Sequence, residues 1–324
     1  MSPRKSKPSG KARARTKART SAKSIPQSTV IGKQKASAAI EYMDAVGDPR
    51  APAAKRALRK ASRNTTFSGL IRGFLSPKEK PIYGITEHQY GYFGVDPNTP
   101  SDDLGIKDAG YIKANGALKN QHVRVTLDRL RVAEYPGKGK HTVLVEYSAL
   151  HVIPTGATQD LRFSQKYQVE EGTGAGVRGY PIFVGLAVSS EGIALTGRTI
   201  NVMNADDKGI LGFLDQPVFK RGLEMINVVN PALPVVTSMV LSISELLLKR
   251  HENIAVQSFD LGLDFSDVPS RAHLREGSYI IVQAPDEGWD WSEWKFTRST
   301  GKLTDKQTKK PIPYNYLVIG VSKM

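Results

Sequence analysis

The chain has 324 residues and no cysteine, and its 40% hydrophobic and 24% charged residues are typical of a globular protein. The lack of cysteine excludes disulfide frameworks, metal sites built on cysteine and cysteine nucleophiles. The 46 basic and 31 acidic residues give a net charge of +15, but residues 1–63 hold 17 of the basic and three of the acidic ones. The other residues carry 29 basic and 28 acidic side chains, so the body of the protein is close to neutral.

Residues 1–37 are a low-complexity segment with 11 basic residues, no acid and no aromatic residue. Such a segment buries too little apolar surface to offset the entropy lost on ordering, so we expect it to be disordered. Its cations suit non-specific, salt-sensitive contact with the phosphates of DNA or RNA. A solubilising or localisation tail without a dedicated ligand is the alternative. The predicted polyanion-binding residues are Arg4, Lys5, Lys7, Lys11, Arg13, Arg15, Lys17, Arg19 and Lys23.

Two short helical patterns follow in the rest of the basic segment. Residues 38–46 predict one helix, which ends at Gly47. Residues 53–62 predict a second helix, whose one large apolar residue, Leu58, implies that it lies in solvent. We therefore expect residues 1–63 to form a basic arm that is disordered or partly helical.

Residues 64–80 predict an amphipathic helix that connects the arm to the body. Its large apolar residues recur at the spacing of one helical face, and Asn64 or Thr65 is placed to cap it. Basic residues beside such a stripe suit docking on an anionic membrane, and packing of the stripe against the protein core is the alternative. The candidate docking residues are Phe67, Leu70, Ile71, Phe74 and Leu75, with Arg59, Lys60 and Arg63 before them.

From about residue 81 the sequence is typical of β-structure. Residues 122–133 alternate in polarity and change phase at Asp128 and Arg129, which predicts a β-bulge. Residues 141–153 are the expected partner strand, after a turn. Residues 181–188 are a continuous apolar run, as in a strand that is buried on both faces. Further strands are predicted over residues 161–169, 193–203, 254–265, 277–284, 289–296 and 314–322.

A helical insertion interrupts the strands at about residues 206–250. Its longest segment, residues 231–250, is apolar nearly all round and is therefore expected to be buried. This segment is too short and too polar to span a membrane, and no secretory signal is visible. We expect a soluble, intracellular and cytoplasmic protein, neither secreted nor transmembrane, with nuclear or nucleoid association as a further option.

This order of elements predicts a mainly β protein. We expect residues 81–324 to form an antiparallel β-sandwich that carries the helical insertion. In architecture alone, the layout resembles the eight-stranded sandwiches of the C2 type. The union of a disordered basic arm with a β-sandwich also resembles icosahedral virus coat proteins, again without a shared motif.

Few motifs in the body point to chemistry. Residues 172–179 are rich in glycine, but they lack the ending of a phosphate-binding loop and lead into a strand, so a flexible loop is expected. Asp260, Asp264 and Asp267 are weak Ca²⁺ candidates, with solvated loop acids as the alternative. The six histidines show no metal-ligand spacing, and no catalytic motif is visible. We therefore expect no cofactor.

All three tryptophans fall within one short segment, at Trp289, Trp291 and Trp294. An exposed cluster would form a platform for a partner, because Trp is enriched in binding hot spots. A buried cluster would supply core residues of an edge strand. In a strand, Trp289 and Trp291 would share one face and Trp294 would point the other way.

The sequence as a whole predicts a non-enzymatic interaction or structural protein. Its basic arm would bind polyanions such as DNA or RNA without sequence specificity, and its sandwich would mediate protein contacts or self-association. Three alternatives stay open at this point. They are a peripheral protein that docks on anionic membrane through residues 53–75, a virus-coat-like shell protein, and an enzyme whose site is not visible in the sequence.

Overall fold

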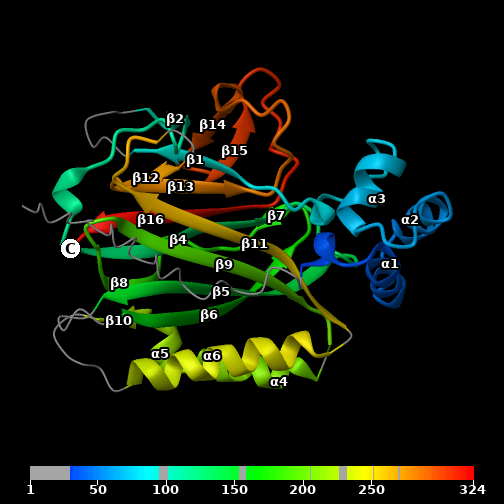
Figure 1. Ribbon diagram of the computed structural model, residues 1–324, viewed down its shortest axis with the longest axis horizontal. Coiled ribbons are helices and arrows are strands. Elements are labelled where there is room, and N and C mark those ends of the chain that lie inside the picture. The colour runs from blue at the N-terminus through cyan, green and yellow to red at the C-terminus, as the bar shows by residue number, and fades with distance from the viewer. Residues whose placement is uncertain are drawn as a thin grey trace, which may run out of the picture.

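The computed structural model describes residues 30–94, 101–152, 158–204, 206–225, 232–250, 252–268 and 271–324. Strands contain 41% of the residues and helices contain 24%, so the protein is mainly β, as its sequence predicts. The described strands form three sheets, of eight, five and three strands. Figure 1 shows the two larger sheets at the centre of the molecule, with the N-terminal helices at one end.

The largest sheet contains both the first and the last of the described strands. In spatial order its path is β10 (Leu223–Glu224), β8 (Tyr180–Ala187), β4 (His122–Val132), β16 (Tyr316–Lys323), β13 (Gly277–Val282), β1 (Gln89–Phe93) and β3 (Lys107–Asp108), and β7 (Thr173–Gly174) also pairs with β4. β10 pairs with β8 in parallel, and the long strands β8, β4, β16, β13 and β1 pair antiparallel. The C-terminal strand β16 therefore lies in the middle of the sheet.

Two further sheets complete the β-structure. The five-stranded sheet has the order β12 (Ala272–His273), β11 (Asn253–Asp264), β9 (Gly192–Val202), β5 (Lys140–Val152) and β6 (Thr158–Glu170). The three-stranded sheet has the order β15 (Lys302–Asp305), β14 (Trp294–Thr297) and β2 (Asp103–Gly105). Figure 1 shows the small sheet above the eight-stranded sheet, on the side away from the five-stranded one.

One large apolar core connects the eight- and five-stranded sheets. The buried side chains of Leu127 in β4 and Phe183 in β8 belong to the same cluster as Val145 in β5 and Phe163 in β6. A smaller cluster lies on the other face of the eight-stranded sheet. In β16, for example, Leu317 and Ile319 belong to the large cluster and Val318 to the small one, which also contains Phe296 and Leu303.

The strand β4 confirms one prediction and corrects another. Leu127 lies opposite Ile319 and Arg129 opposite Val318, so Asp128 is the extra residue of a bulge, as predicted. The predicted pairing of β4 with the following strand is wrong, because β5 pairs with β6 and β9 in the other sheet. Residues 133–139 form a connection long enough to cross between sheets, whereas a tight hairpin would have kept both strands in one sheet.

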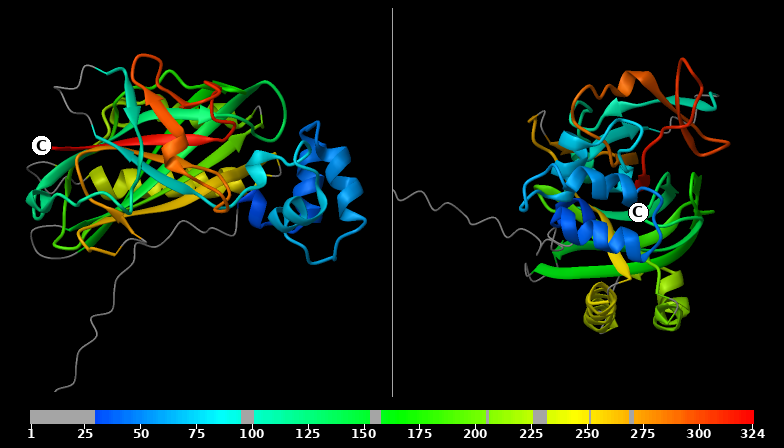
Figure 2. Two further views of the ribbon diagram at one scale, coloured as in Figure 1. Left: turned by 90° about the horizontal axis from the view of Figure 1, so that it is seen from above. Right: turned by 90° about the vertical axis from the view of Figure 1, so that its right-hand side faces the viewer.

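Residues 30–75 form a helical region, which we call the cap. It lies at the right-hand end of the molecule in Figure 1 and again in the left panel of Figure 2. Its elements are η2 (Ile31–Lys33), α1 (Ala36–Ala45), α2 (Ala51–Leu58) and α3 (Phe67–Phe74).

Two sequence predictions for the cap are wrong. The expectation of disorder over residues 1–37 fails for the described residues 30–37, because Val30 and Ile31 are buried in the core. The second helix does not lie wholly in solvent, because one face of α2 is buried through small side chains that allow close helix packing. Those side chains are Ala51, Ala54 and Ala57, with 2%, 1% and 4% of their surface exposed.

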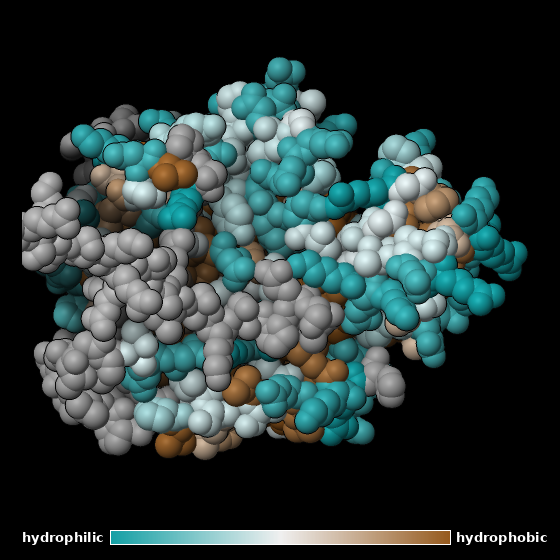
Figure 3. All heavy atoms as spheres, viewed as in Figure 1, coloured by the Kyte–Doolittle hydropathy of each residue, from teal (hydrophilic) through white to brown (hydrophobic). Residues whose placement is uncertain are grey.

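The helical insertion consists of α4 (Asp207–Leu211), η5 (Gly212–Asp215), α5 (Pro217–Lys220) and α6 (Ala232–Leu248). In α6, Val236, Val240 and Leu247 are buried. The expected burial of the whole helix is wrong, because α6 lies at the surface and covers the sheet with one face. Hydrophobic residues are visible along the lower edge of Figure 3, where α6 lies. Among the described side chains of α6, the large apolar ones that are exposed are Val235, Met239 and Leu246.

The face of the five-stranded sheet beneath α6 carries a buried ionic group. Glu146 is fully buried, and its two carboxylate oxygens accept hydrogen bonds from Arg162 at 3.1 Å and Arg198 at 2.6 Å. Arg162 also pairs with Asp160 at 3.2 Å, and its backbone N–H donates to Thr237 Oγ1 in α6. Burying these charges is tolerated because each has a partner of opposite sign.

No helix among the described residues is long and apolar enough to cross a membrane.

Candidate functional site

The nine predicted polyanion-binding residues, from Arg4 to Lys23, lie outside the described residues. The described chain begins at Val30, which forms a parallel bridge with Ala255 in β11. This bridge defines where the N-terminal basic segment joins the body. The cationic residues that the structure describes therefore belong to the cap and to the body.

The end of α2 and the loop after it form the cationic surface of the cap. Arg59, Lys60 and Arg63 are exposed, and no ion pair within the described residues involves any of them. Arg50, Lys55, Arg56 and Arg72 of the cap do have carboxylate partners, as Lys55 has in Asp44 at 2.6 Å. Three neighbouring unpaired cations are available for an external anion, and we call Arg59, Lys60 and Arg63 the cap cations.

The apolar stripe beside the cap cations faces the protein. Phe67 and Leu70 are fully buried and Ile71 is 3% exposed, whereas Phe74 is 44% exposed. Gly84 permits this packing, because a Cβ atom there would lie 1.9 Å from Cδ1 of Ile71. Of the predicted membrane-docking residues in this stripe, lipid would reach Phe74 first, since Leu75 is also buried.

The residue that caps the N-terminus of α3 differs from the prediction by one or two positions. Neither Asn64 nor Thr65 caps the helix. Thr66 does, because its Oγ1 accepts a hydrogen bond from the backbone N–H of Gly69 at 3.2 Å. The helix therefore begins at Phe67, and this places the first large apolar side chain of the stripe against the core.

Two buried carboxylates hold the cap on the sheets. Asp48, which is 5% exposed, accepts hydrogen bonds from the hydroxyl of Tyr83 and from the backbone N–H of Gly137, both at 2.9 Å. Glu134 pairs with the guanidinium of Arg50 and accepts a hydrogen bond from the backbone N–H of Ile82 at 3.0 Å. The cap cations are thus carried by a segment with a defined position on the body.

The carboxyl group of Glu134 should make stability depend on pH. Burial raises its pKa from 4.5 to about 7, against the opposing effects of the Ile82 N–H and Arg50. The folded state therefore holds a proton on Glu134 between about pH 4.5 and 7 that the unfolded state releases. Its contribution to stability is fully present below the lower value and is lost as the pH rises through the upper one.

We expect the free energy of unfolding of the wild-type protein to fall by about 2–3 kcal/mol more than that of Glu134→Gln between pH 5 and pH 8. Urea titrations of both proteins at these pH values measure the difference. Glu79→Gln is the matched control, because Glu79 is a partly exposed carboxylate that pairs with Arg56 in the cap. Parallel pH profiles for the wild-type protein and Glu134→Gln would contradict the assignment.

The three tryptophans form one cluster in which Trp289 contacts both of the others, in contrast to the predicted strand. Residues Trp291–Glu293 form the turn η6, and β14 begins only at Trp294. This turn brings the rings of Trp289 and Trp294 into a stack with centroids 5.7 Å apart and an interplanar angle of 12°. Trp291 is 5% exposed, and the other two are half-buried. The cluster lies on the small core, and its use as a partner platform stays a prediction.

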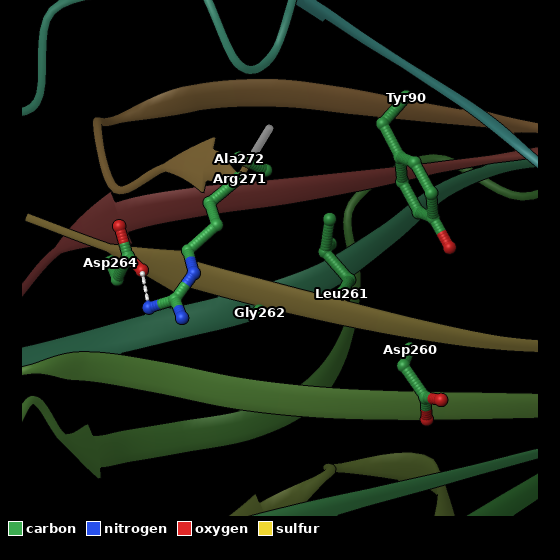
Figure 4. Close-up of a pocket in the computed structure, with 7 residues that line it drawn as sticks. All are labelled: Tyr90, Asp260, Leu261, Gly262, Asp264, Arg271 and Ala272. Atoms are coloured by element: carbon green, nitrogen blue, oxygen red, sulfur yellow. Dashed lines mark hydrogen bonds and ion pairs between the residues drawn. The ribbon is translucent and has the colours of Figure 1, made fainter. Parts of the chain in front are cut away.

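The three candidate calcium ligands do not converge. Asp260 and Asp264 line a pocket of about 290 Å³ beside Tyr90, and Figure 4 shows the two carboxylates apart from each other. Asp264 instead pairs with Arg271 at 3.3 Å. Asp267 does not line this pocket. Among the described residues, no group of three or more His, Asp or Glu side chains is placed to hold a metal ion.

One group of cations was missed by the sequence reasoning. Arg129 and Arg131 lie two residues apart in β4, and Arg178 lies in the glycine-rich loop. The spacing of the first two signals a shared face of a strand. Nothing in the sequence signals that the glycine-rich loop lies beside that face.

No protein-family model, curated protein or solved structure matches this chain.

Proposed function

We propose that this protein is a non-enzymatic polyanion-binding protein that contacts the phosphates of DNA or RNA without reading their sequence. The observation that carries the proposal is the separation of charge from apolar surface in the cap. Arg59, Lys60 and Arg63 are exposed, while most of the neighbouring stripe is buried. Exposed cations beside a mostly buried apolar stripe suit contact with solvated phosphates. Docking on a bilayer interface would need that stripe to be exposed. The nine cations of residues 1–29 precede it in the chain and would add to the same contact.

The body would act as a neutral scaffold for this cationic surface. We infer that the eight- and five-stranded sheets form an antiparallel β-sandwich, which the core shared by both sheets supports. The exposed apolar side chains Val235, Met239 and Leu246 of α6 support a role of the body in protein contacts or self-association. A shell-like assembly is one form that such self-association would take.

Loss of cations should lower both the affinity for nucleic acid and its dependence on salt. For a single-stranded oligonucleotide, the slope of log K against log salt concentration should fall by about 0.7 for each phosphate contact that is lost. The triple variant Arg59→Gln, Lys60→Gln, Arg63→Gln should therefore reduce the slope by about 2. Deletion of residues 1–29 should reduce it further. Fluorescence anisotropy over a series of salt concentrations measures these slopes.

A matched variant controls for the loss of net charge. Lys107→Gln, Arg124→Gln and Arg221→Gln together remove the same kinds of exposed cation from other parts of the surface. We expect a smaller change of slope in this control. An equal change of slope in the control would show that binding depends on net charge and is not localised to the cap cations. Unchanged slopes in all variants would overturn the proposal.

Vesicles separate nucleic-acid binding from the membrane alternative. Phe74→Asp should preserve the fold because Phe74 is exposed, whereas Leu70→Asp would bury a charge. Under the proposed function, Phe74→Asp binds the oligonucleotide as the wild-type protein does. Cosedimentation with phosphatidylserine vesicles that is lost in Phe74→Asp would favour docking of residues 53–75 on a membrane.

A further inference from the structure

The missed arginines meet where β4, the glycine-rich loop and the turn between β14 and β15 come together. Opposite Arg129 and Arg131 in the ladder lie Val318 and Tyr316, both members of the small core. Directly paired residues point to the same face of a sheet, so both arginines lie on the face that carries the three-stranded sheet. They stand at the edge of the small core.

The loop and the turn close around these two side chains. Arg131 Nη1 donates to the carbonyl oxygen of Gly172 at 2.7 Å, at the start of the loop. Arg178 Nη2, near the end of the loop, donates to the carbonyl oxygen of Ser299 in the turn at 2.9 Å. Three arginines thus join three segments that lie far apart in the sequence.

Two glycines leave room for the guanidinium of Arg129. A Cβ atom at Gly174 would lie 2.9 Å from its Nε, and one at Gly301 would lie 3.2 Å from its Nη1. The group therefore lies against both the loop and the turn. The segment predicted as a flexible loop forms one wall of an arginine cluster, which we define as Arg129, Arg131 and Arg178.

The positive charge of the arginine cluster is not neutralised by a carboxylate. No ion pair within the described residues includes any of its three members. The Nε atoms of Arg129 and Arg131 are buried and have no hydrogen-bond partner there. Burial and the adjacent charge of Arg129 lower the pKa of Arg131. Arg129 and Arg131 are half-buried and Arg178 is exposed, so the cluster has partly desolvated positive charge that an anion from solvent can reach and offset.

Two carboxylates beside these segments accept hydrogen bonds from groups outside the arginine cluster. The carboxylate of Asp102 accepts hydrogen bonds from the backbone N–H and the hydroxyl of Ser299. The carboxylate of Asp128 accepts from the hydroxyls of Thr126 at 2.7 Å and Ser278 at 3.3 Å. Neither carboxylate forms an ion pair with the cluster within the described residues.

We propose that the arginine cluster is a phosphate-binding site on the body of the protein. Guanidinium groups from separate segments approach an anion from several directions, and a tetrahedral phosphate offers acceptor oxygens in each of them. The phosphate belongs either to a nucleic-acid strand or to a small phosphomonoester. The first source rests on the proposed function and would extend the same contact, because Glu134, three residues after Arg131, is the partner of Arg50 in the cap.

The test uses the full chain and the double variant Arg129→Gln, Arg178→Gln. The control Arg124→Gln, Arg221→Gln removes two arginines from other exposed positions. Calorimetric titration with inorganic phosphate should show binding that is weaker by roughly tenfold or more in the first variant and unchanged in the control. With a single-stranded oligonucleotide, the salt slope of the first variant should fall by about 1.4. Thermal unfolding reports whether each variant is folded.

The outcomes separate the site from its ligand and from the function of the cap. Weaker phosphate binding with an oligonucleotide slope equal to that of the control assigns the site to a small phosphomonoester. Weaker phosphate binding in the cluster variant, with no effect of the cap variants on nucleic acid, retains this site and removes the proposed function. Equal phosphate binding in cluster and control variants overturns the inference. If the double variant is unfolded, Arg178→Gln alone decides, since Arg178 is exposed.

Discussion

Glu146→Gln should lower the free energy of unfolding by about 3–5 kcal/mol. Glu146 is fully buried and is the shared partner of Arg162 and Arg198, which are 5% and 3% exposed. The amide of Gln keeps the shape of the side chain but cannot balance the charges of the two arginines. Asp160 pairs with Arg162 but not with Arg198, so Arg198 would lose its carboxylate partner. A loss of this size is a large fraction of the stability of an ordinary domain. Urea unfolding followed by circular dichroism measures it.

An exposed ion pair provides the contrast for Glu146→Gln. Asp44→Asn removes the partner of Lys55, and the two side chains are 58% and 47% exposed. We expect a loss below about 1 kcal/mol for this variant, because water solvates both charges once the pair is broken. A loss for Glu146→Gln no larger than that for Asp44→Asn would contradict the assigned role of the carboxylate.

Asp48→Ala should destabilise the protein by about 3–5 kcal/mol, and the loss should begin in the cap. The carboxylate accepts hydrogen bonds from Tyr83, Gly137 and the backbone N–H of Arg50, the last at 2.8 Å. Removing it leaves three donors without their acceptor beneath α1 and α2. Hydrogen exchange should become faster in residues 30–75 before it does so in the strands.

Asp44→Ala is the control for this variant, because Asp44 is an exposed aspartate of the same region. It should leave both the unfolding free energy and the exchange of the cap nearly unchanged. If Asp48→Ala accelerates exchange evenly throughout the chain, Asp48 does not hold the cap in particular. A cap that detaches readily would also release the buried stripe and favour the membrane alternative.

The fixed position of the cap bears directly on the proposed function. Glu134 and Asp48 tie the cap to the end of β4, only a few residues from Arg131. The cap cations and the arginine cluster are therefore both anchored to the same part of the body. If both sites bind one strand, Asp48→Ala should weaken nucleic-acid binding even though it removes a negative charge.

Much of the β-structure could be predicted from local patterns. The phase change at Asp128 predicted the bulge in β4, because alternation of polarity reports directly which side chains face the core. The apolar run over residues 181–188 likewise corresponds to β8, whose residues 182–186 are buried. The stripe over residues 67–75 predicted α3 for the same reason, since its period is that of a helix.

The pairing of strands and the environment of individual side chains could not be predicted from the sequence. The residues of β4 and β5 are adjacent in the chain, yet the two strands belong to different sheets. The tryptophans were assigned to one strand, but the hydrogen bond from the backbone N–H of Ser292 to the side chain of Asp290 starts a turn between them. In both cases a short local conformation redirects the chain, and periodicity of polarity does not record it.

The charge step at residue 63 is a property of the sequence alone, because formal charge depends on composition and not on folding. The strand periods and the apolar stripe are also local properties, and they specify a mainly β body with an amphipathic helix before it. Tertiary structure decided which way each surface faces. It buried most of the stripe, left the cap cations exposed, and brought Arg129, Arg178 and Gly301 together across 172 residues of chain. Such proximity arises from packing between distant segments, and that is why a nearly neutral body can still hold a concentrated positive site.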